Sequence, residues 1–492
     1  MILYYLQFGL YLLLMLVIGY ISMNKTRNNR DFIIGGRTLG PFTSAISAGA
    51  SDMSSWLLLG LPGSVFAGGL KEGVWISLGL LIGAYANWLI VAGRLRSMTG
   101  RYGTVTLPSF ISKRFDDKLG ILKVVSTIVI LFFFTLYVAS GLKGGTLLFS
   151  HTFNASEHLG LIVTTAVVVS YTFLGGYLAV CWTDLIQGLL MLGALIFCAL
   201  LAYFAIRGQG SQILAASPNA FQFKTSWISG LSLLAWGFGY FGQPHILARF
   251  IGIRDVKDVP AARRIGVTWM GVCLVLATVI GIIGIGYNSI HPLPGLNGEA
   301  ANSERIFLAL TSALFHPLFG GFVLAAVLAA VMSTADSQLL VLTSSLTEDI
   351  PFIASQSGKK KAMISRFGVV GFALLAFLIA YNDSGSILGM VGYAWGGFGA
   401  SFGPIIVLSV LWKGTSKWGA LAGMIVGAGT IFVVKNFINI PGEYFYELLP
   451  GFILAFIVTV LVSLITPKPS SEVLEVFEQS KHEVKKVPLL SK

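Results

Sequence analysis

The sequence predicts an all-helical protein that crosses a membrane many times. Of its 492 residues, 55% are hydrophobic and only 11% are charged, whereas about 25% of the residues in soluble globular proteins are charged. The apolar residues also form long runs, many of them about the 20 residues that a helix needs to cross roughly 30 Å of hydrocarbon. So few charges could not cover a soluble fold of this length. We therefore expect residues 1–467 to form one membrane domain.

Thirteen apolar runs are candidates for transmembrane helices. The first, residues 2–23, is longer than the core of a signal peptide and lacks a small-residue cleavage site after it, so we expect it to remain as a span. The three cysteines have no metal-ligand spacing and are expected to be small core residues. The thirteen runs begin near residues 2, 40, 74, 119, 160, 185, 226, 266, 317, 363, 387, 418 and 451.

The lysines and arginines predict the orientation of the chain, because short cytoplasmic loops hold an excess of them. With the N-terminus outside, 27 of the 33 fall on the inner side, and the C-terminus is cytoplasmic. Residues 468–492 mix charges with little apolar pattern, so we expect a mobile cytoplasmic tail. The net charge of +12 is explained by loops that face an anionic lipid surface. Nucleic acid is not needed as a partner.

Two of the predicted spans are interrupted by residues that a plain membrane helix would not carry. Residues 44–63 contain Gly49, five serines and Asp52, and residues 230–245 are interrupted by Gly237, Gly239, Gly242 and Pro244. Such breaks are tolerated where the freed backbone groups are buried in protein or line a polar cavity. The alternative is that the glycines merely allow close packing of helices. That alternative does not explain Asp52.

The two interrupted spans are the second and the seventh of the series, so they enter the membrane from opposite sides. The second to sixth helices, about 40–206, and the seventh to eleventh, about 226–412, therefore form two inverted sets of five. Interrupted helices at the first position of each inverted half are typical of a binding site near the bilayer midplane in secondary transporters.

Three carboxylates lie in or at the edge of spans, where a charge costs roughly 2.5–3.5 kcal/mol on insertion scales. Asp52 lies within the second span and Asp336 within the ninth, while Asp184 precedes the sixth. We interpret Asp52 as functional. For Asp184 a helix cap is an equal alternative, because carboxylates favour helix N-termini. Asp336 either alters ion affinity or proton sensitivity or faces a cytoplasmic vestibule at the end of its helix.

Hydroxyl groups gather on one face of the ninth span. Residues 330, 333, 334 and 337 share that face by helical geometry, and Ser333, Thr334 and Ser337 supply oxygens. Together with carbonyls released by a broken helix, these oxygens suit a sodium ion. The alternative is that each hydroxyl binds a carbonyl of its own helix.

The segments SAGASDMSSWLLLGLPG, WGFGYFGQPHILARF and AAVMST closely resemble the sodium/solute symporter family, and within it the symporters of proline. The resemblance runs from the first span through the thirteenth. It implies a leucine-transporter-type fold of two inverted five-helix repeats. It also implies sodium as coupling ion and proline as substrate, in a multi-pass protein of the cell membrane.

The resemblance also implies the residues of the site. The sodium ligands would be the carbonyls of Ala50, Met53 and Ala330 and the hydroxyls of Ser333 and Thr334, with Asp52 and Asp184 in coupling. The residues for proline would be Ser54, Trp56, Tyr137, Trp236 and Tyr240. An amino acid in a low-dielectric site needs both of its charges met, and aromatic side chains can enclose its ring.

Other functions are weighed against this one. The alternative within transport is sodium- or proton-coupled symport of another small solute, such as a short carboxylate or another amino acid. An enzyme would need a metal cluster or an activated nucleophile at membrane depth, and we expect none, since the six histidines lie mostly in loops or the tail. A sensor would need a larger soluble domain than 25 residues provide.

Overall fold

The computed structural model describes all of the chain except residues 1, 24–28, 173–175, 297–299, 384 and 489–492. The described residues form helices and one isolated β-bridge, between Leu39 and Ile253. The all-helical class predicted from the sequence is therefore confirmed.

The first half of the chain contains the following helices: α1 (Ile2–Met23), α2 (Asn29–Ile34), η1 (Gly35–Arg37), α3 (Pro41–Asp52), η2 (Trp56–Gly60), α4 (Leu61–Gly68), α5 (Leu70–Asn87), η3 (Trp88–Ala92), α6 (Gly93–Tyr102), α7 (Leu107–Arg114), α8 (Ile121–Phe153), α9 (Glu157–Thr172), α10 (Tyr177–Ile206) and α11 (Gly210–Ala216). The second half contains α12 (Trp227–Leu234), η4 (Ala235–Gly242), α13 (Pro244–Gly252), η5 (Val256–Asp258), α14 (Val259–Ile290), α15 (Ala300–Ser303), α16 (Ile306–Leu314), α17 (Pro317–Asp349), α18 (Pro351–Ala354), α19 (Gly358–Asn382), α20 (Ile387–Leu411), α21 (Lys417–Phe437), α22 (Leu448–Ile465) and α23 (Ser471–Lys485).

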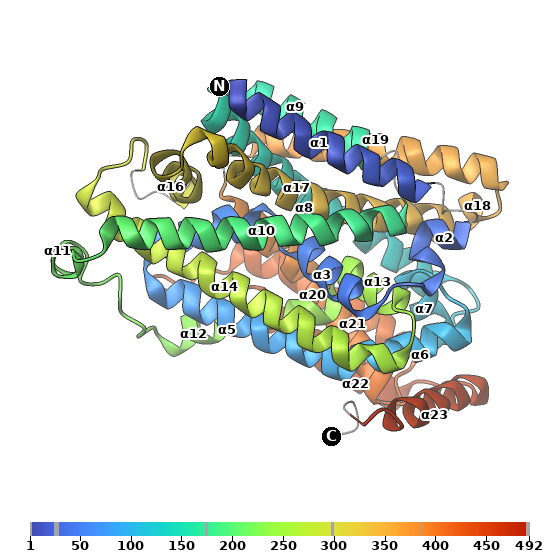
Figure 1. The fold of residues 1–492 in the computed structure, drawn as a ribbon. Coiled ribbons are helices and arrows are strands. Elements are labelled where there is room, and N and C mark those ends of the chain that lie inside the picture. Colours follow the sequence, from blue (N-terminus) through green and yellow to red (C-terminus); the bar gives the residue numbers. More distant parts are fainter. Residues whose placement is uncertain (1, 24–28, 173–175, 297–299, 384, 489–492) are drawn as a thin grey trace.

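Within the described residues, ten helical segments are long and apolar enough to cross a membrane. They lie side by side, with α11, α12 and α16 at one end of the bundle and α2, α7 and α18 at the other (Figure 1). A helix begins near each of the thirteen predicted starts. The largest shifts are at α10 and α14, which begin at Tyr177 and Val259 rather than near 185 and 266.

Helices α17 and α20 form the centre of the bundle. In their most apolar windows 83% and 89% of the residues are buried, against 28% in α1 and in the apolar part of α19. Helix α17 packs against α8, α10 and the interrupted segment α3. The face of α17 that carries Ser333 and Thr334 is therefore held inside the protein, away from lipid.

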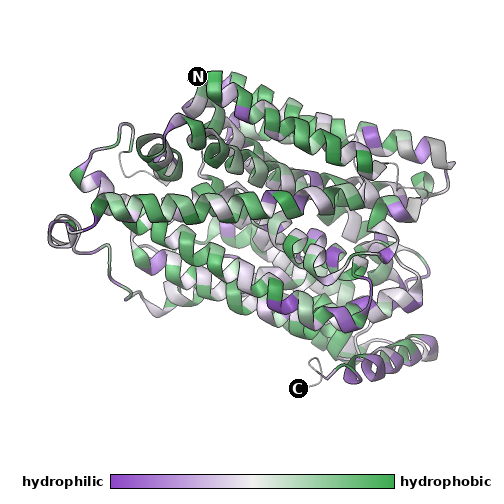
Figure 2. Ribbon diagram, viewed as in Figure 1, coloured by the Kyte–Doolittle hydropathy of each residue, from purple (hydrophilic) through white to green (hydrophobic). Residues whose placement is uncertain are grey.

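The C-terminal segment corrects one expectation. Residues Ser471–Lys485 are not a mobile tail but helix α23, which packs against α6 at the edge of the bundle (Figure 1). It is coloured mainly as hydrophilic, in contrast to the long helices (Figure 2). Its few apolar residues, among them Val473, Phe477 and Val484, are buried, and the Glu483 carboxylate accepts hydrogen bonds from Ser97 and Arg101. The helical spacing of these apolar residues puts them on one face of α23.

Candidate functional site

The first interrupted span breaks directly after Asp52. Helix α3 ends there, and Met53 takes the non-helical angles φ −81° and ψ 75°. The chain then re-enters a helix at Trp56 through the π-helical turn η2. Because the backbone leaves the helix at this point, the last carbonyls of α3 lose their intrahelical partners. The break predicted from the sequence is present, at the depth where the polar residues cluster.

The second interrupted span contains a different kind of break. Helix α12 passes into a stretch of 3₁₀ helix, η4, and after Gln243 at φ −77° and ψ 109° the chain continues as α13. The carbonyls freed by this change accept hydrogen bonds from side chains. Asn87 Nδ2 donates to the Tyr240 carbonyl at 2.8 Å, and Trp395 Nε1 donates to the Trp236 carbonyl at 2.8 Å.

Glycine lets the second break pack directly on α5. A Cβ added at Gly83 would stand 2.1 Å from the carbonyl oxygen of Gly237, and one added at Gly237 would stand 2.2 Å from that of Gly79. Both distances are far shorter than a van der Waals contact. The backbones can approach this closely only without side chains. This contact fixes the position of η4 and hence of the aromatic residues that it carries.

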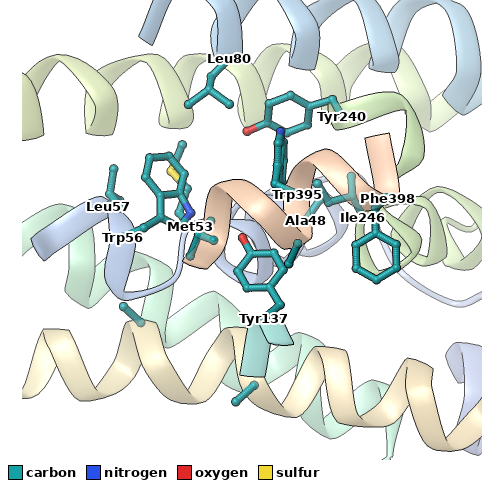
Figure 3. Close-up of a cluster of buried hydrophobic side chains, with 14 of the residues drawn as sticks. Ala48, Met53, Trp56, Leu57, Leu80, Tyr137, Tyr240, Ile246, Trp395 and Phe398 are labelled. Carbon is teal, nitrogen blue, oxygen red and sulfur yellow. The ribbon is translucent and has the colours of Figure 1, made fainter. Parts of the chain in front are cut away.

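Aromatic side chains, among them Trp56, Tyr137 and Tyr240, cluster at the first break (Figure 3), and their polar groups bind Asp52. The Tyr240 hydroxyl donates to its carboxylate. Two more groups donate to its main-chain carbonyl, Trp56 Nε1 at 3.0 Å and the Tyr137 hydroxyl at 3.3 Å. The Asp52 side chain is 1% exposed, and its second carboxylate oxygen has no hydrogen-bond partner among the described residues. A buried carboxylate oxygen without a partner is costly, so this atom is available to a cation or to a donor on a solute.

The predicted sodium ligands come together where α17 crosses the first break. Ser333 Oγ donates to the carbonyl oxygens of Ala50 at 2.9 Å and Ala330 at 3.2 Å. The Thr334 hydroxyl is buried and has no hydrogen-bond partner in the described part of the chain. Met53 follows the end of α3, so its carbonyl also leaves the helix. These neutral oxygen donors suit a hard monovalent cation, and Ala50 lies two residues before Asp52 at the end of α3.

A second polar cluster lies on the side of the first one that faces α13. Arg249 Nη2 and Asp184 Oδ2 form an ion pair at 3.0 Å, and both side chains are 0% exposed. Ser47 Oγ donates to the same carboxylate oxygen at 2.7 Å, and Arg249 Nη2 also donates to Ser337. This inner cluster, Ser47, Asp184, Arg249 and Ser337, joins four helices: α3, α10, α13 and α17.

Trp236 lies apart from the other predicted substrate residues. Ser54, Trp56, Tyr137 and Tyr240 gather at Asp52, whereas Trp236 lines a cavity of about 550 Å³ between α4, α20 and the segment that joins α21 to α22. Its Nε1 donates to the Tyr444 hydroxyl at 3.2 Å. The predicted pocket is therefore divided between a closed centre and an outer cavity with Trp236 in its wall.

Comparison with known proteins identifies the family. The model of the sodium:solute symporter family matches residues 32–427. The high-affinity proline transporter PutP of Bacillus subtilis is 46% identical over 94% of this chain and 98% of its own length. The sodium/proline symporter of Escherichia coli is 44% identical over 96% of this chain and 95% of its own length. The chain belongs to the sodium:solute symporter family.

A solved structure shows that the fold is shared within transporters of this kind. The structure of a substrate-bound sodium-coupled sialic acid symporter covers 95% of this symporter and 99% of its own chain, with a TM-score of 0.79 at 18% identity. At this identity the likeness concerns the fold alone.

Two expectations about the carboxylates of this symporter are wrong. Asp184 does not cap a helix, because α10 begins at Tyr177 with Gly176 at its N-cap. Asp336 does not face a vestibule at a helix end, because α17 continues to Asp349 and Asp336 is 0% exposed. Both Asp336 carboxylate oxygens lack a hydrogen-bond partner among the described residues, and the group interacts electrostatically with Asp184 and Arg249. Asp336 therefore belongs beside the inner cluster of the symporter.

Several site residues were not predicted from the sequence. Arg249 was counted among the arginines of a cytoplasmic loop, although it is fully buried. Asn87, Gln243 and Trp395 stabilise the second break by donating to the carbonyls of Tyr240, Gly239 and Trp236 respectively. The available signal was the polar character of Asn87 and Gln243 within apolar runs, which marks groups that must be paired in a membrane. For Trp395 the sequence offers no signal.

Proposed function

We propose that this symporter carries L-proline into the cell together with sodium. The observation that carries the proposal is the near full-length similarity to proline symporters, combined with a broken-helix site whose polar groups converge on one buried carboxylate, Asp52. The gradient of sodium drives the uptake, since a charge that crosses 100 mV contributes about 2.3 kcal/mol. The chain acts as a transporter and not as an enzyme.

For sodium, the proposed ligands are the carbonyls of Ala50, Met53 and Ala330 and the hydroxyls of Ser333 and Thr334. Three of these oxygens already lie within hydrogen-bond distance through Ser333, which supports the assignment. A sodium ion would take the place of these internal hydrogen bonds. The charge of Asp52 would then offset much of the cost of burying the ion.

For proline, the proposed residues are Ser54, Trp56, Tyr137, Trp236 and Tyr240. The cavity beside Asp52 and Tyr240 measures only about 20 Å³, room for about one water molecule and far too little for proline. Proline can therefore enter only if the aromatic side chains around the break move outward. In this proposal sodium binding and aromatic rearrangement are coupled, and each ligand raises the affinity of the other by the same factor.

The two clusters are proposed to act on opposite sides of the transported solute. The outer cavity with Trp236 leads toward one membrane face, and the inner cluster of Asp184 and Arg249 joins the inner half-helices α3 and α13 to α10 and α17. Breaking and remaking this inner cluster would open and close the cytoplasmic path, with Asp184 receiving sodium on its way inward.

For the architecture, we propose thirteen spans: the ten long segments, α9, and the two broken helices α3–α4 and α12–α13. The inverted repeats would be about 40–206 and 226–412 within a transport domain of residues 1–467, followed by the cytoplasmic segment 468–492. Each repeat then begins with a broken helix, which supports the arrangement. The N-terminus would lie outside the cell membrane and the C-terminus inside.

The orientation can be tested with single cysteines in a cysteine-free background. Gln209 lies between α10 and α11 and the exposed Glu475 lies on α23, and α11 and α23 lie near opposite ends of the bundle (Figure 1). An impermeant thiol reagent applied to intact cells is expected to label Gln209→Cys and not Glu475→Cys. Permeabilised cells, in which both positions should react, are the control. Labelling of Glu475→Cys on intact cells would contradict both the orientation and the repeat assignment.

Uptake of radiolabelled proline into reconstituted vesicles tests the function itself. We expect accumulation with an inward sodium gradient and none with potassium. The alternative function is sodium- or proton-coupled symport of a different small solute, such as a short carboxylate or another amino acid. It would be favoured if an unlabelled carboxylate or second amino acid competed better than proline, or if a proton gradient alone drove uptake.

Trp236→Ala is expected to weaken proline binding at saturating sodium by about tenfold, which corresponds to ~1.4 kcal/mol. The reason is the loss of a large aromatic wall beside the solute. Sodium binding measured without proline should stay within about twofold, because no predicted sodium ligand contacts the indole. The matched control is Trp227→Ala on the same half-helix, since Trp227 is 75% exposed. Normal proline binding with loss of proline-free sodium binding would place Trp236 in the scaffold instead.

A further inference from the structure

The segment that joins α21 to α22, residues 438–447, is fastened to the outer half of the second broken helix. The Glu443 carboxylate accepts hydrogen bonds from Ser226 and Ser229, the latter at 2.7 Å, and the Tyr444 N–H donates to Ser229 Oγ at 2.8 Å. These hydrogen bonds also lower the pKa of Glu443, so the group is ionised at neutral pH. A negative charge at the N-terminus of α12 is further favoured by the helix dipole.

The same segment holds the indole of Trp236. The ring of Tyr446 stacks on it, with centroids 5.0 Å apart and an interplanar angle of 25°. The Tyr444 hydroxyl accepts the hydrogen bond from Trp236 Nε1 at 3.2 Å. Tyr446 is 2% exposed, although it follows a loop. Tyr444 thus binds the N–H of the indole and Tyr446 packs on its ring. Both residues lie outside the two proposed five-helix repeats.

Tyr446 also connects the broken helix to α20. Its hydroxyl donates to the Gly392 carbonyl at 2.8 Å, and a Cβ added at Gly392 would stand 3.2 Å from the Trp236 ring. The three residues therefore form one packed unit in the wall of the 550 Å³ cavity. If η4 moves relative to α20, Tyr446 must change its contact either with Trp236 on η4 or with Gly392 on α20.

We propose that Tyr446 is a positioning residue for the solute: it holds Trp236 in the orientation that closes the outer side of the pocket, while Glu443 ties the segment 438–447 to α12. The inference rests on the proposed function, in which Trp236 contacts proline. It gives the segment between α21 and α22, which follows the second proposed repeat, a part in solute affinity that acts through Trp236.

The test compares variants for proline binding at saturating sodium and for sodium binding without proline. Tyr446→Ala removes the stacking and is expected to weaken proline binding about tenfold, with sodium binding within about twofold. Tyr446→Phe keeps the ring and should restore proline binding to within about threefold. The matched control is Tyr381→Ala, which should bind proline like the wild type, because Tyr381 is 52% exposed, makes its ring contacts with His158 and Phe377 and does not line this cavity.

Glu443→Ala is a second variant that leaves the packed interior intact, and it should weaken proline binding about threefold. The inference is overturned if Tyr446→Ala and Glu443→Ala both bind proline like the wild type. It is also overturned if they lose sodium binding to the same extent, which would indicate a role in the scaffold alone. A wild-type protein that binds no proline would instead refute the proposed function, so the two failures are distinguishable.

Discussion

Asp52→Asn is expected to raise the sodium concentration for half-maximal proline uptake by at least about tenfold. Asparagine keeps an oxygen that can accept the hydrogen bond from Tyr240, so the aromatic cluster should retain its arrangement. What is lost is the negative charge, in a place where the Asp52 side chain is almost fully buried. A cation in such a site depends on that charge, because each unit charge is expensive to bury without a partner.

Thr334→Ala is expected to act in the same direction with a smaller effect, since it removes one neutral oxygen. The matched control for both is Asp349→Asn. Asp349 is also a buried aspartate, but it lies at the far end of α17, where it accepts hydrogen bonds from Thr106 and Ser109 and pairs with Lys123. Sodium activation curves of uptake decide the matter. If Asp52→Asn and Thr334→Ala both gave the sodium activation curve of the wild type, neither residue would belong to the ion site.

Asp184→Asn and Arg249→Gln are each expected to destabilise the purified protein strongly, by about 3–5 kcal/mol, because either one leaves a buried charge without its hydrogen-bonded ion-pair partner. The pair is fully buried at 3.0 Å. The double variant, which removes both charges, should regain much of the thermal stability. Uptake should stay low in all three, because the inner cluster would no longer join the helices that close the cytoplasmic path.

The exposed pair Arg254–Asp258 supplies the control for that experiment. Its arginine is 62% exposed, and exposed ion pairs contribute about 0–1 kcal/mol, so Asp258→Asn should leave the thermal stability and uptake nearly unchanged. Melting temperature and initial uptake rate are the two measurements. If the double variant recovers full uptake together with its stability, the ion pair is structural and has no part in opening the path.

The sequence by itself determined the membrane class, the positions of the helices and the two breaks. These features depend on local composition. A helix must present apolar residues over its whole length in lipid, and only glycine, proline and polar residues at membrane depth can mark a break. For the same reason the sequence alone pointed to Asp52, Ser333 and Thr334 as site residues, because polar groups at membrane depth are costly to bury unless they have partners.

Only the tertiary structure decided which groups are those partners. From the sequence, Arg249 is one more positive residue near a loop and Asp184 could be a helix cap. In the structure, α13 and α10 bring the two side chains together as a buried ion pair. Tyr446 reads as part of an outer loop, although its ring packs on Trp236 more than 200 positions earlier in the chain. The sequence of the C-terminal segment suggests a mobile tail, whereas in the structure α6 packs against the apolar face of α23. Such contacts depend on how distant helices pack, and the free energy of that packing is not encoded in any single segment of the sequence.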